Sequence, residues 1–231
     1  MENVFEPRSI RPIGFIENDF KEKFGIPRQS GSTSLRSRVV LFEPYCNEDA
    51  FRRIEGFSHL WLVFDFSKAR EQGEPPLTVR PPRLGGNERV GVFASRSPFR
   101  PNFLGLSCVR FLGLEKKNGK VVALSVEGAD LLDKTAIYDV KPYLPHADCI
   151  LEATGGYADE VKDHRLQVVF SEQVATKLPS NKRQGLKECL EQDPRPAYQE
   201  EGREYKMRFA EWEIAFEVIG GVLTVTKIEK A

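Results

Sequence analysis

The chain has 231 residues, 40% of them hydrophobic, and its 34 lysine and arginine side chains balance its 34 aspartate and glutamate side chains. This composition excludes a disordered chain, and the length allows one large domain or two small ones. The zero net charge excludes a global field that would attract nucleic acid or an anionic membrane, so any polyanion binding must be local.

Short segments rich in β-branched and aromatic residues, bounded by Gly, Pro, Asn or Ser, predict strands over most of the first two-thirds of the chain. Asn118-Gly119 predicts a hairpin turn, and a single short helix fits between Asn47, which can cap it, and Gly56. This pattern favours a small barrel or sandwich over a doubly wound parallel sheet. The expected strands are Ile10–Ile16, Arg38–Phe42, His59–Phe66, Arg89–Ala94, Ser107–Leu114 and Lys120–Val126.

After Gly155-Gly156 the pattern changes to a mixture of helices and strands. Two helices are expected, at Ser171–Leu178 and Lys182–Gln192, between a strand at Leu166–Phe170 and a final pair of strands. That final pair is Trp212–Val218 and Val222–Ile228, joined by Gly220-Gly221. The sequence therefore predicts a mainly β protein, with a barrel over residues 1–155 and a smaller α+β domain over residues 156–231.

No stretch approaches the roughly 18 continuous apolar residues of a membrane span, and the N-terminus lacks a signal-peptide core. The four cysteines show no CxxC spacing, which argues against a zinc site or a disulfide framework. We therefore expect a cytoplasmic protein with reduced thiols, no membrane contact and no metal.

Several loops combine arginine with proline. In the stretch GVFASRSPFRPNFLGLS, Pro98 and Pro101 stiffen the loop, while Arg96 and Arg100 supply planar forks suited to carboxylate or phosphate. Such a loop is either an anion clamp or a corner whose arginines pair with acidic neighbours. Similar loops at residues 27–31, 79–83, 130–135 and 139–143 either converge on one site or are solvated connections.

The segments FSHLWLVFDF, TVRPPRLGGN, GVFASRSPFRPN, DLLDKTAIYDVKPYLP and QDPRPAY resemble the TsaA-like, TrmO-type tRNA methyltransferases, in the same order and from about Ile10 to the end of the chain. The resemblance implies S-adenosylmethionine as cofactor and methyl transfer to the exocyclic amine of threonylcarbamoyl-adenosine beside the tRNA anticodon. It also implies a β-barrel catalytic domain, a homodimer and a cofactor held by loops at one barrel end.

Residue by residue, the resemblance implies a set of cofactor contacts. The implied cofactor contacts are Arg28, Gln29, Ser30, Phe66, Ser67, Arg96, Leu106, Asp133, Lys134, Thr135 and Ala136. Because the protein is neutral overall, binding of tRNA calls for a local positive rim, which Arg80, Arg83, Arg100, Lys141 and Arg195 could form. The expected contacts with the tRNA anticodon loop are Arg100, Asn102, Lys141, Tyr143, Asp193, Arg195 and Tyr198.

Methyl transfer from a sulfonium depends mainly on holding donor and acceptor in line, so little acid–base machinery is needed. An arginine suits the methionine carboxylate of the cofactor and an apolar slot suits its adenine. Asp133, Asp139 and Asp193 are candidate proton acceptors that the sequence does not rank. Tyr143 and Tyr198 either stack on an unpaired base or pack in the protein.

Three positions depart from the family pattern. This chain has Phe103-Leu104 where RPNPIG is common, Lys134 where a DGTP-like turn has glycine, and Ser67 in place of a histidine. The loss of a glycine removes easy access to positive φ, which affects the loop geometry but leaves the arginines in place. A second interpretation is a non-catalytic module that binds RNA or a small anion through the same loops.

Overall fold

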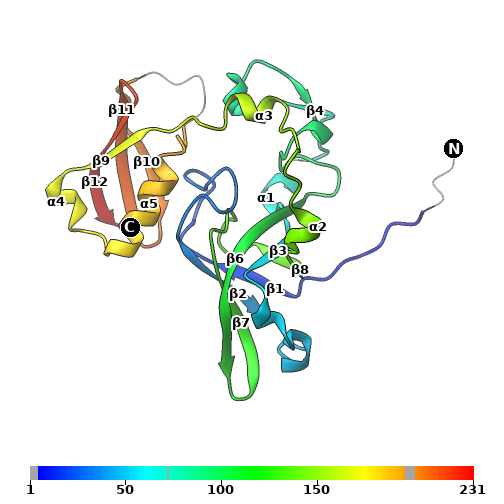
Figure 1. Cartoon of the computed structure of the whole chain (residues 1–231). Coiled ribbons are helices and arrows are strands. Elements are labelled where there is room, and N and C mark those ends of the chain that lie inside the picture. Colours follow the sequence, from blue (N-terminus) through cyan, green and yellow to red (C-terminus); the bar gives the residue numbers. More distant parts are fainter. Residues whose placement is uncertain (1–4, 72, 196–200) are drawn as a thin grey trace.

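The computed structural model describes residues 5–71, 73–195 and 201–231. Its centre is a closed barrel of six antiparallel strands in the order β1-β2-β7-β6-β3-β8 (Figure 1). The strands are β1 (Gly14–Glu17), β2 (Arg36–Leu41), β3 (His59–Asp65), β6 (Leu104–Lys117), β7 (Lys120–Glu127) and β8 (Ala136–Pro142). The expected barrel is confirmed.

Alternation along the barrel strands places one set of apolar side chains inside. In β3, Leu60 and Leu62 are fully buried, whereas His59, Trp61 and Val63 are half-buried on the outer face. Burial of such a leucine contributes about 1.5–3 kcal/mol, so the inward face of each strand supplies most of the stability of the barrel.

The long β6–β7 hairpin projects from the barrel (Figure 1). Its turn at Asn118-Gly119 has positive φ at both residues, 53° and 73°, as the dipeptide predicts.

The C-terminal part is a four-stranded sheet in the order β10-β11-β12-β9, covered by helices α4 and α5 (Figure 1). The elements are β9 (Gln167–Phe170), α4 (Glu172–Ala175), α5 (Ser180–Leu190), β10 (Tyr205–Phe209), β11 (Trp212–Ile219) and β12 (Val222–Lys230). The α+β character and the turn at Gly220-Gly221 are confirmed, whereas β10 was not expected. The boundary at residue 155 stays a prediction.

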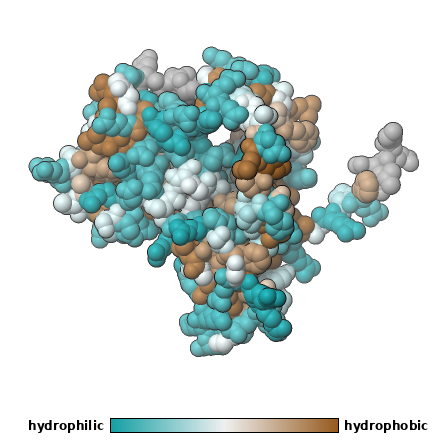
Figure 2. Space-filling model, in the orientation of Figure 1, coloured by the Kyte–Doolittle hydropathy of each residue, from teal (hydrophilic) through white to brown (hydrophobic). Residues whose placement is uncertain are grey.

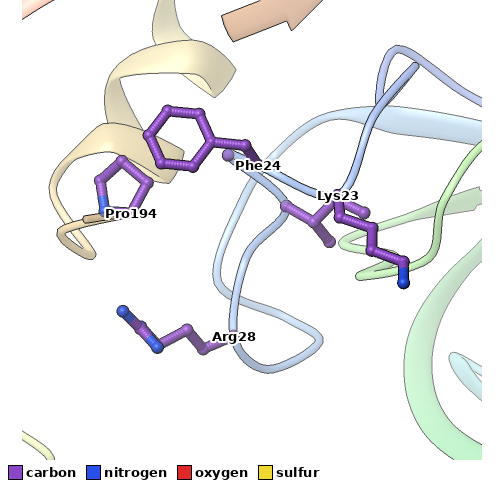
Figure 3. Close-up of a pocket in the computed structure, with 6 residues that line it drawn as sticks. Lys23, Phe24, Arg28 and Pro194 are labelled. Carbon is purple, nitrogen blue, oxygen red and sulfur yellow. The ribbon is translucent and has the colours of Figure 1, made fainter. Parts of the chain in front are cut away.

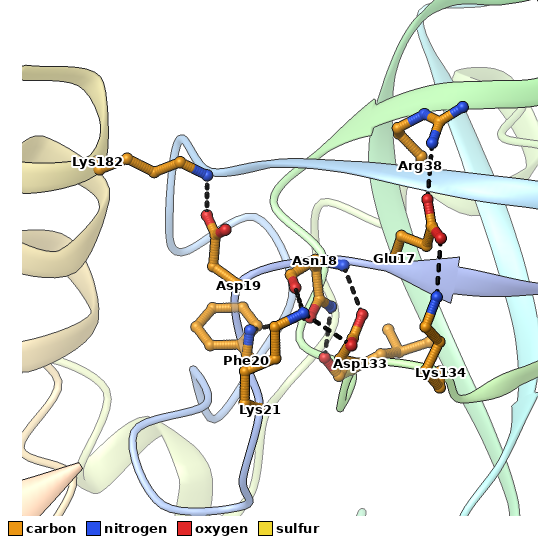
Figure 4. A network of polar contacts seen from close by, with 10 residues as sticks. Glu17, Asn18, Asp19, Phe20, Lys21, Arg38, Asp133, Lys134 and Lys182 are labelled. Atoms are coloured by element: carbon orange, nitrogen blue, oxygen red, sulfur yellow. Dashed lines mark hydrogen bonds and ion pairs between the residues drawn. The ribbon is translucent and has the colours of Figure 1, made fainter. Parts of the chain in front are cut away.

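The loop between β1 and β2, residues 18–35, belongs to the C-terminal core as much as to the barrel. Phe20 and Leu35 are buried in the C-terminal hydrophobic cluster, and the amide of Ala210 donates to the carbonyl of Asp19 at 2.8 Å. Gly185 of α5 allows this approach, because a Cβ there would lie 2.3 Å from Leu35 Cδ2. Lys182 of α5 also forms an ion pair with Asp19 (Figure 4).

The expectation that Arg89–Ala94 forms a barrel strand is wrong. Val90–Gly91 (β5) pairs only with Thr78–Val79 (β4) in a separate two-stranded sheet, and Val92–Ala94 is a 3-10 turn (η4). Val92 is buried whereas Phe93 is 78% exposed, so only one of these two apolar side chains packs in the protein, as in a surface turn. The sixth barrel strand is β8, in a segment where the sequence predicted loops.

The prediction of a single helix between Asn47 and Gly56 is also wrong, because this segment forms two 3-10 turns, Glu48–Phe51 (η1) and Ile54–Gly56 (η2). Asn47 does cap the first turn, since its Oδ1 accepts from the amide of Asp49 at 2.9 Å. Arg53 has φ of 72°, which interrupts the helix.

The remaining elements are short, and they are α1 (Ser67–Arg70), η3 (Pro82–Leu84), α2 (Pro145–Asp148) and α3 (Tyr157–Glu160). Within the described ranges, no helix is long and apolar enough to cross a membrane. The face shown in Figure 2 is mainly hydrophilic, with separate hydrophobic groups over both the C-terminal part and the barrel side.

Candidate functional site

A cavity of about 270 Å³ lies where β3 ends, between the segment Phe64–Ala69, the loop around Phe99 and the loop after β7. Its walls are mainly apolar. The rings of Phe64 and Phe66 meet edge to face at 5.1 Å, and Leu131, Leu132 and Phe99 complete the apolar lining. Two facing aromatic rings and aliphatic walls suit a flat, weakly polar ring system.

Gly105 of β6 makes room for the Phe64 ring. The two residues are cross-strand partners, and a Cβ at Gly105 would lie 2.2 Å from Phe64 Cζ. The glycine therefore fixes where the aromatic wall of the cavity stands.

Buried polar groups also line this cavity. Ser107 Oγ donates to Asp130 Oδ1 at 2.6 Å, the backbone amide of Ser30 hydrogen-bonds the same carboxyl group, and Arg96 is near enough to stabilise its charge. Burial nevertheless dominates and raises the pKa of Asp130. Asp130 thus joins the cavity to the loop that carries Arg28, Gln29 and Ser30.

Three of the Arg/Pro and acidic loops singled out in the sequence do come together. Arg96 Nη1 donates to Gln29 Oε1 at 2.6 Å, and the amide of Gly31 donates to the carbonyl of Gly128 at 2.8 Å, just before the loop that holds Asp130. Arg96 is exposed at this junction, and Pro98 and Phe99 of the same loop line the cavity.

Of the predicted cofactor contacts, Phe66, Ser67 and Thr135 line the cavity directly. Asp133 and Lys134 instead belong to a surface network (Figure 4). Asp133 accepts from the amide of Asn18 at 2.9 Å and from Lys21 Nζ at 2.7 Å, and Lys134 pairs with Glu17 at 2.7 Å.

The other predicted cofactor contacts also lie outside the lining of this cavity, and they are Arg28, Gln29, Ser30, Arg96, Leu106 and Ala136. Ala136 begins β8. Leu106 is 58% exposed on the outer barrel face, opposite Val63.

The departures from the family pattern can be located. Lys134 has φ of 64° and Phe103 has φ of 51°, so both non-glycine residues adopt the left-handed region. The strain at Lys134 is offset by its ion pair with Glu17 and by its ammonium lying 4.5 Å from the Phe15 ring centroid.

A second cavity of about 350 Å³ lies beside the first, at the contact between the barrel and the C-terminal part (Figure 3). Lys23 and Ile26 line both cavities. Arg28 lines the second, together with Phe24 and Pro194.

The turn Asp193–Arg195 borders this second cavity through Pro194. Arg28 Nη2 donates to the carbonyls of Asp193 and Arg195 at 3.0 and 3.1 Å. The Asp193 carboxylate accepts from Arg195 Nε and Nη2 at 2.8 and 3.0 Å, and these bonds hold the pKa of Asp193 low against the opposing effect of burial. Tyr198 lies outside the described residues.

The other predicted substrate contacts do not face either cavity lining. Tyr143 packs against Trp61, with ring centroids 5.8 Å apart, and its amide donates to the carbonyl of His59. His59 begins β3 and Asp65 ends it, so Tyr143 lies about 20 Å from the cavity along a strand that rises roughly 3.3 Å per residue.

The charged members of this group are also partly engaged. Lys141 pairs with Asp139 at 3.0 Å, and Arg100 Nη1 donates to the carbonyl of Ser95 at 3.0 Å. Asn102 is exposed in the turn before β6.

Sequence reasoning missed the residues that shape the cavities most. Phe64, Asp65 and Phe99 stand inside motifs that were quoted, but periodicity alone does not say which inward residues border a cavity. Asp65 is buried and forms an ion pair with Arg70, and Asp130 was noted only as part of a loop. A carboxylate next to a run of leucines is the signal that could have found Asp130.

The fold is therefore a closed antiparallel barrel whose cavity, with aromatic walls and the carboxylates of Asp65 and Asp130, suits a small ligand with a flat ring. Within the described part of the chain, no cluster of three or more His, Cys, Asp or Glu side chains is placed to hold a metal ion.

The chain belongs to the tRNA-methyltransferase O family. Residues 15–149 match the N-terminal domain of that family and residues 163–231 match its C-terminal domain.

Two relatives and one solved structure extend this match. The chain is 42% identical over 207 residues to a tRNA (adenine(37)-N6)-methyltransferase from Escherichia coli, covering 87% of each chain. It is also 42% identical over 216 residues to a Pseudomonas aeruginosa protein whose name assigns it to the S-adenosylmethionine-dependent methyltransferases, covering 89% of this chain and 90% of the relative. A crystal structure of TrmO from P. aeruginosa superimposes with a TM-score of 0.80 at 33% identity over the whole of both chains.

Proposed function

We propose that this chain transfers a methyl group from S-adenosylmethionine to the exocyclic N6 amine of an adenine next to the tRNA anticodon, where that adenine carries the threonylcarbamoyl group. The observation that carries the proposal is the pair of adjoining cavities. One is aromatic-walled and suits a nucleoside cofactor, and the other is lined by Arg28 and by Pro194 of the turn whose carbonyls Arg28 binds.

The side chains in and next to the first cavity fit the chemical groups of the cofactor. The rings of Phe64 and Phe66 would hold the adenine, Asp130 would accept a hydrogen bond from the cofactor, and Arg96 at the rim would bind the methionine carboxylate. When bound, S-adenosylmethionine supplies an electrophilic methyl group. The protein supplies orientation and exclusion of water from the reacting atoms.

The proton released by the amine needs an acceptor, and three carboxylates were candidates. Asp139 pairs with Lys141 on the barrel, Asp133 contacts Asn18 and Lys21, and neither carboxylate lies next to a residue that lines the second cavity. We propose Asp193, because the next residue along the chain, Pro194, lines that cavity together with Arg28. The low pKa of Asp193 keeps it ionised and therefore able to accept a hydrogen bond from the amine at neutral pH.

We also propose a cytoplasmic homodimer. The outer barrel face carries an apolar strip, since Val63 pairs with Leu106 and Trp61 pairs with Cys108 on neighbouring strands. Beyond α2, Leu151 is 92% exposed. Exposed apolar side chains of this kind support association with a second copy, across which Leu106 could reach a cofactor. Light scattering after gel filtration measures the oligomeric state, and Leu106→Glu should shift the protein from dimer towards monomer.

Transfer of radiolabelled methyl from S-adenosylmethionine to tRNA tests the activity. We expect label in tRNA that carries the threonylcarbamoyl group and background label in the same tRNA without it. Calorimetry with S-adenosylmethionine separates this function from the alternative, because a plain RNA-binding module should give no specific heat. Binding of tRNA without cofactor binding or transfer would favour the alternative.

A further inference from the structure

We propose that Arg28 and Arg83 form a subsite for an oxyanion of the RNA substrate, at the contact between the barrel and the C-terminal part. The inference rests on the proposed function for the identity of the substrate. Its own basis is a pair of partly buried guanidinium groups whose donors the described protein does not use up.

Arg83 Nη1 donates to the carbonyl of Val161 at 3.2 Å, which holds the side chain in place. Among the described residues, its Nε and Nη2 are buried and have no hydrogen-bond partner, and the same holds for Nε of Arg28. Three buried nitrogens on two arginines can therefore still donate a hydrogen bond to a ligand. Buried donors of this kind have a hydrogen-bond partner in nearly all native structures.

The local positive charge is only partly compensated among the described residues. Burial lowers the pKa of Arg28, and it lowers the pKa of Arg83 together with the nearby positive charges of Arg28 and Arg165. The Asp193 carboxylate acts in the opposite direction on both arginines. That carboxylate is already bound by Arg195 through two hydrogen bonds and lies 3.3 Å from His164 Nε2.

A ligand that fits must bring negative charge and several acceptor oxygens. Phosphate and carboxylate both match the planar fork of arginine, and a charge-assisted hydrogen bond to either is stronger than one to a neutral acceptor. Arg28 bonds the carbonyls of the Asp193–Arg195 turn, so the subsite adjoins the second cavity. Burying two cations beside one carboxylate that Arg195 already binds costs folding free energy, which an RNA oxyanion would offset on binding.

The substrate contains two kinds of oxyanion that could bind here, a backbone phosphate of the tRNA and the carboxylate of its threonylcarbamoyl group. The test uses Arg83→Gln, which keeps the length and polarity of the side chain but removes its charge. The matched control is Arg52→Gln, which removes one positive charge at η1, where Arg52 pairs with Asp49 on the surface. Affinity for tRNA with and without the threonylcarbamoyl group is measured by filter binding over a series of salt concentrations.

We expect R83Q to bind the modified tRNA about tenfold or more weakly, the effect of losing a charge-assisted contact. If a phosphate occupies the subsite, both tRNAs lose affinity equally and the slope of log K against log salt falls by about one. If the carboxylate occupies it, only the modified tRNA loses affinity. R52Q should bind both tRNAs like the wild type.

A folded R83Q protein that binds both tRNAs as tightly as R52Q would overturn the subsite. If R83Q does not fold, Arg83→Lys replaces it and Arg52→Lys becomes the control. Lysine keeps the charge but not the fork, so a loss of tRNA affinity in R83K beyond that in R52K supports the subsite, and equal affinity overturns it. Failure of the proposed function looks different. If substitution of Arg83 weakens tRNA binding but the wild-type protein transfers no methyl group, the proposed activity is wrong and the subsite is still supported.

Discussion

Gly105→Ala should reduce cofactor binding by moving an aromatic wall, without adding any polar group to the cavity. The added Cβ would lie 2.2, 2.4 and 2.8 Å from three atoms of the Phe64 ring, so the ring must retreat by about 1.2 Å to reach an ordinary contact distance of 3.4 Å. Phe64 is 4% exposed and its inner side is packed, which leaves the cavity as the open direction.

The expected cost has two parts. Overpacking of a buried ring typically destabilises a protein by about 1–3 kcal/mol. The displaced ring would also narrow a cavity of about 270 Å³ and tilt against Phe66, so we expect S-adenosylmethionine affinity to fall by about tenfold, or roughly 1.4 kcal/mol. Urea unfolding measures the first part and calorimetry measures the second.

Gly91→Ala is the matched control, because a Cβ at Gly91 meets no atom within 4 Å and the residue has φ of −59°. G91A should keep the stability and cofactor affinity of the wild type. If G105A behaves like G91A in both measurements, Phe64 does not form a wall of the cofactor site.

Three further substitutions test the two cavities. Arg96→Ala should weaken S-adenosylmethionine binding by about 1.5–3 kcal/mol while leaving the fold intact, and unchanged affinity in calorimetry would remove Arg96 from the site. Asp130→Asn should become more stable relative to the wild type as pH rises above the ordinary carboxyl range. Burial raises the pKa of Asp130 in the folded state, so the carboxyl group of the unfolded wild type loses its proton at lower pH, and the wild type loses stability that the uncharged Asn variant keeps. Urea unfolding at pH 5 and pH 8 checks that sign, and a constant difference would contradict it. Arg195→Ala should depress methylation of tRNA but spare cofactor affinity, and wild-type transfer rates would make its turn purely structural.

The strands that the sequence predicted well are those whose signal is local. His59–Asp65 is a run of aliphatic and aromatic residues, and Asn118-Gly119 marks the turn between β6 and β7, so both follow from residues that are neighbours in the chain. Ala136–Pro142 was missed because Asp139 and Lys141 give it a polar, loop-like composition. It is a strand because β1 and β3 flank it and complete its hydrogen bonds, which is a tertiary effect.

The opposite error at residues 89–94 has the same cause. Val90-Gly91-Val92-Phe93 has the composition of a strand, but only a two-residue partner is available, so the pairing stops after Gly91. The missed strand Tyr205–Phe209 differs, since its alternation of buried and exposed residues is complete and could have been found from the sequence.

The candidate site was predictable as a set of loops but not as two cavities. Motifs located Phe66, Thr135 and the arginine loops, because each motif is contiguous. That Arg28 contacts the carbonyls of Asp193 and Arg195 could not be predicted, since it depends on how the β1–β2 loop packs in the C-terminal core.

One short segment of that loop, Lys23–Ile26, couples the two cavities. Phe24 stacks nearly parallel on Phe216 of the C-terminal core, with ring centroids 6.1 Å apart, while Lys23 and Ile26 line both cavities. Gly25 permits this course, because it has φ of 88° and a Cβ there would lie 2.2 Å from Met207 Cε.

Gly25→Ala should therefore weaken binding of both S-adenosylmethionine and tRNA, whereas a substitution within one cavity should affect mainly one ligand. Gly202→Ala controls for backbone strain alone, since Gly202 has φ of 76° and open space around it. Calorimetry and filter binding on the two variants separate the effects. A G25A protein that loses stability like G202A but keeps both affinities would show that the segment only joins the cavities and does not shape them.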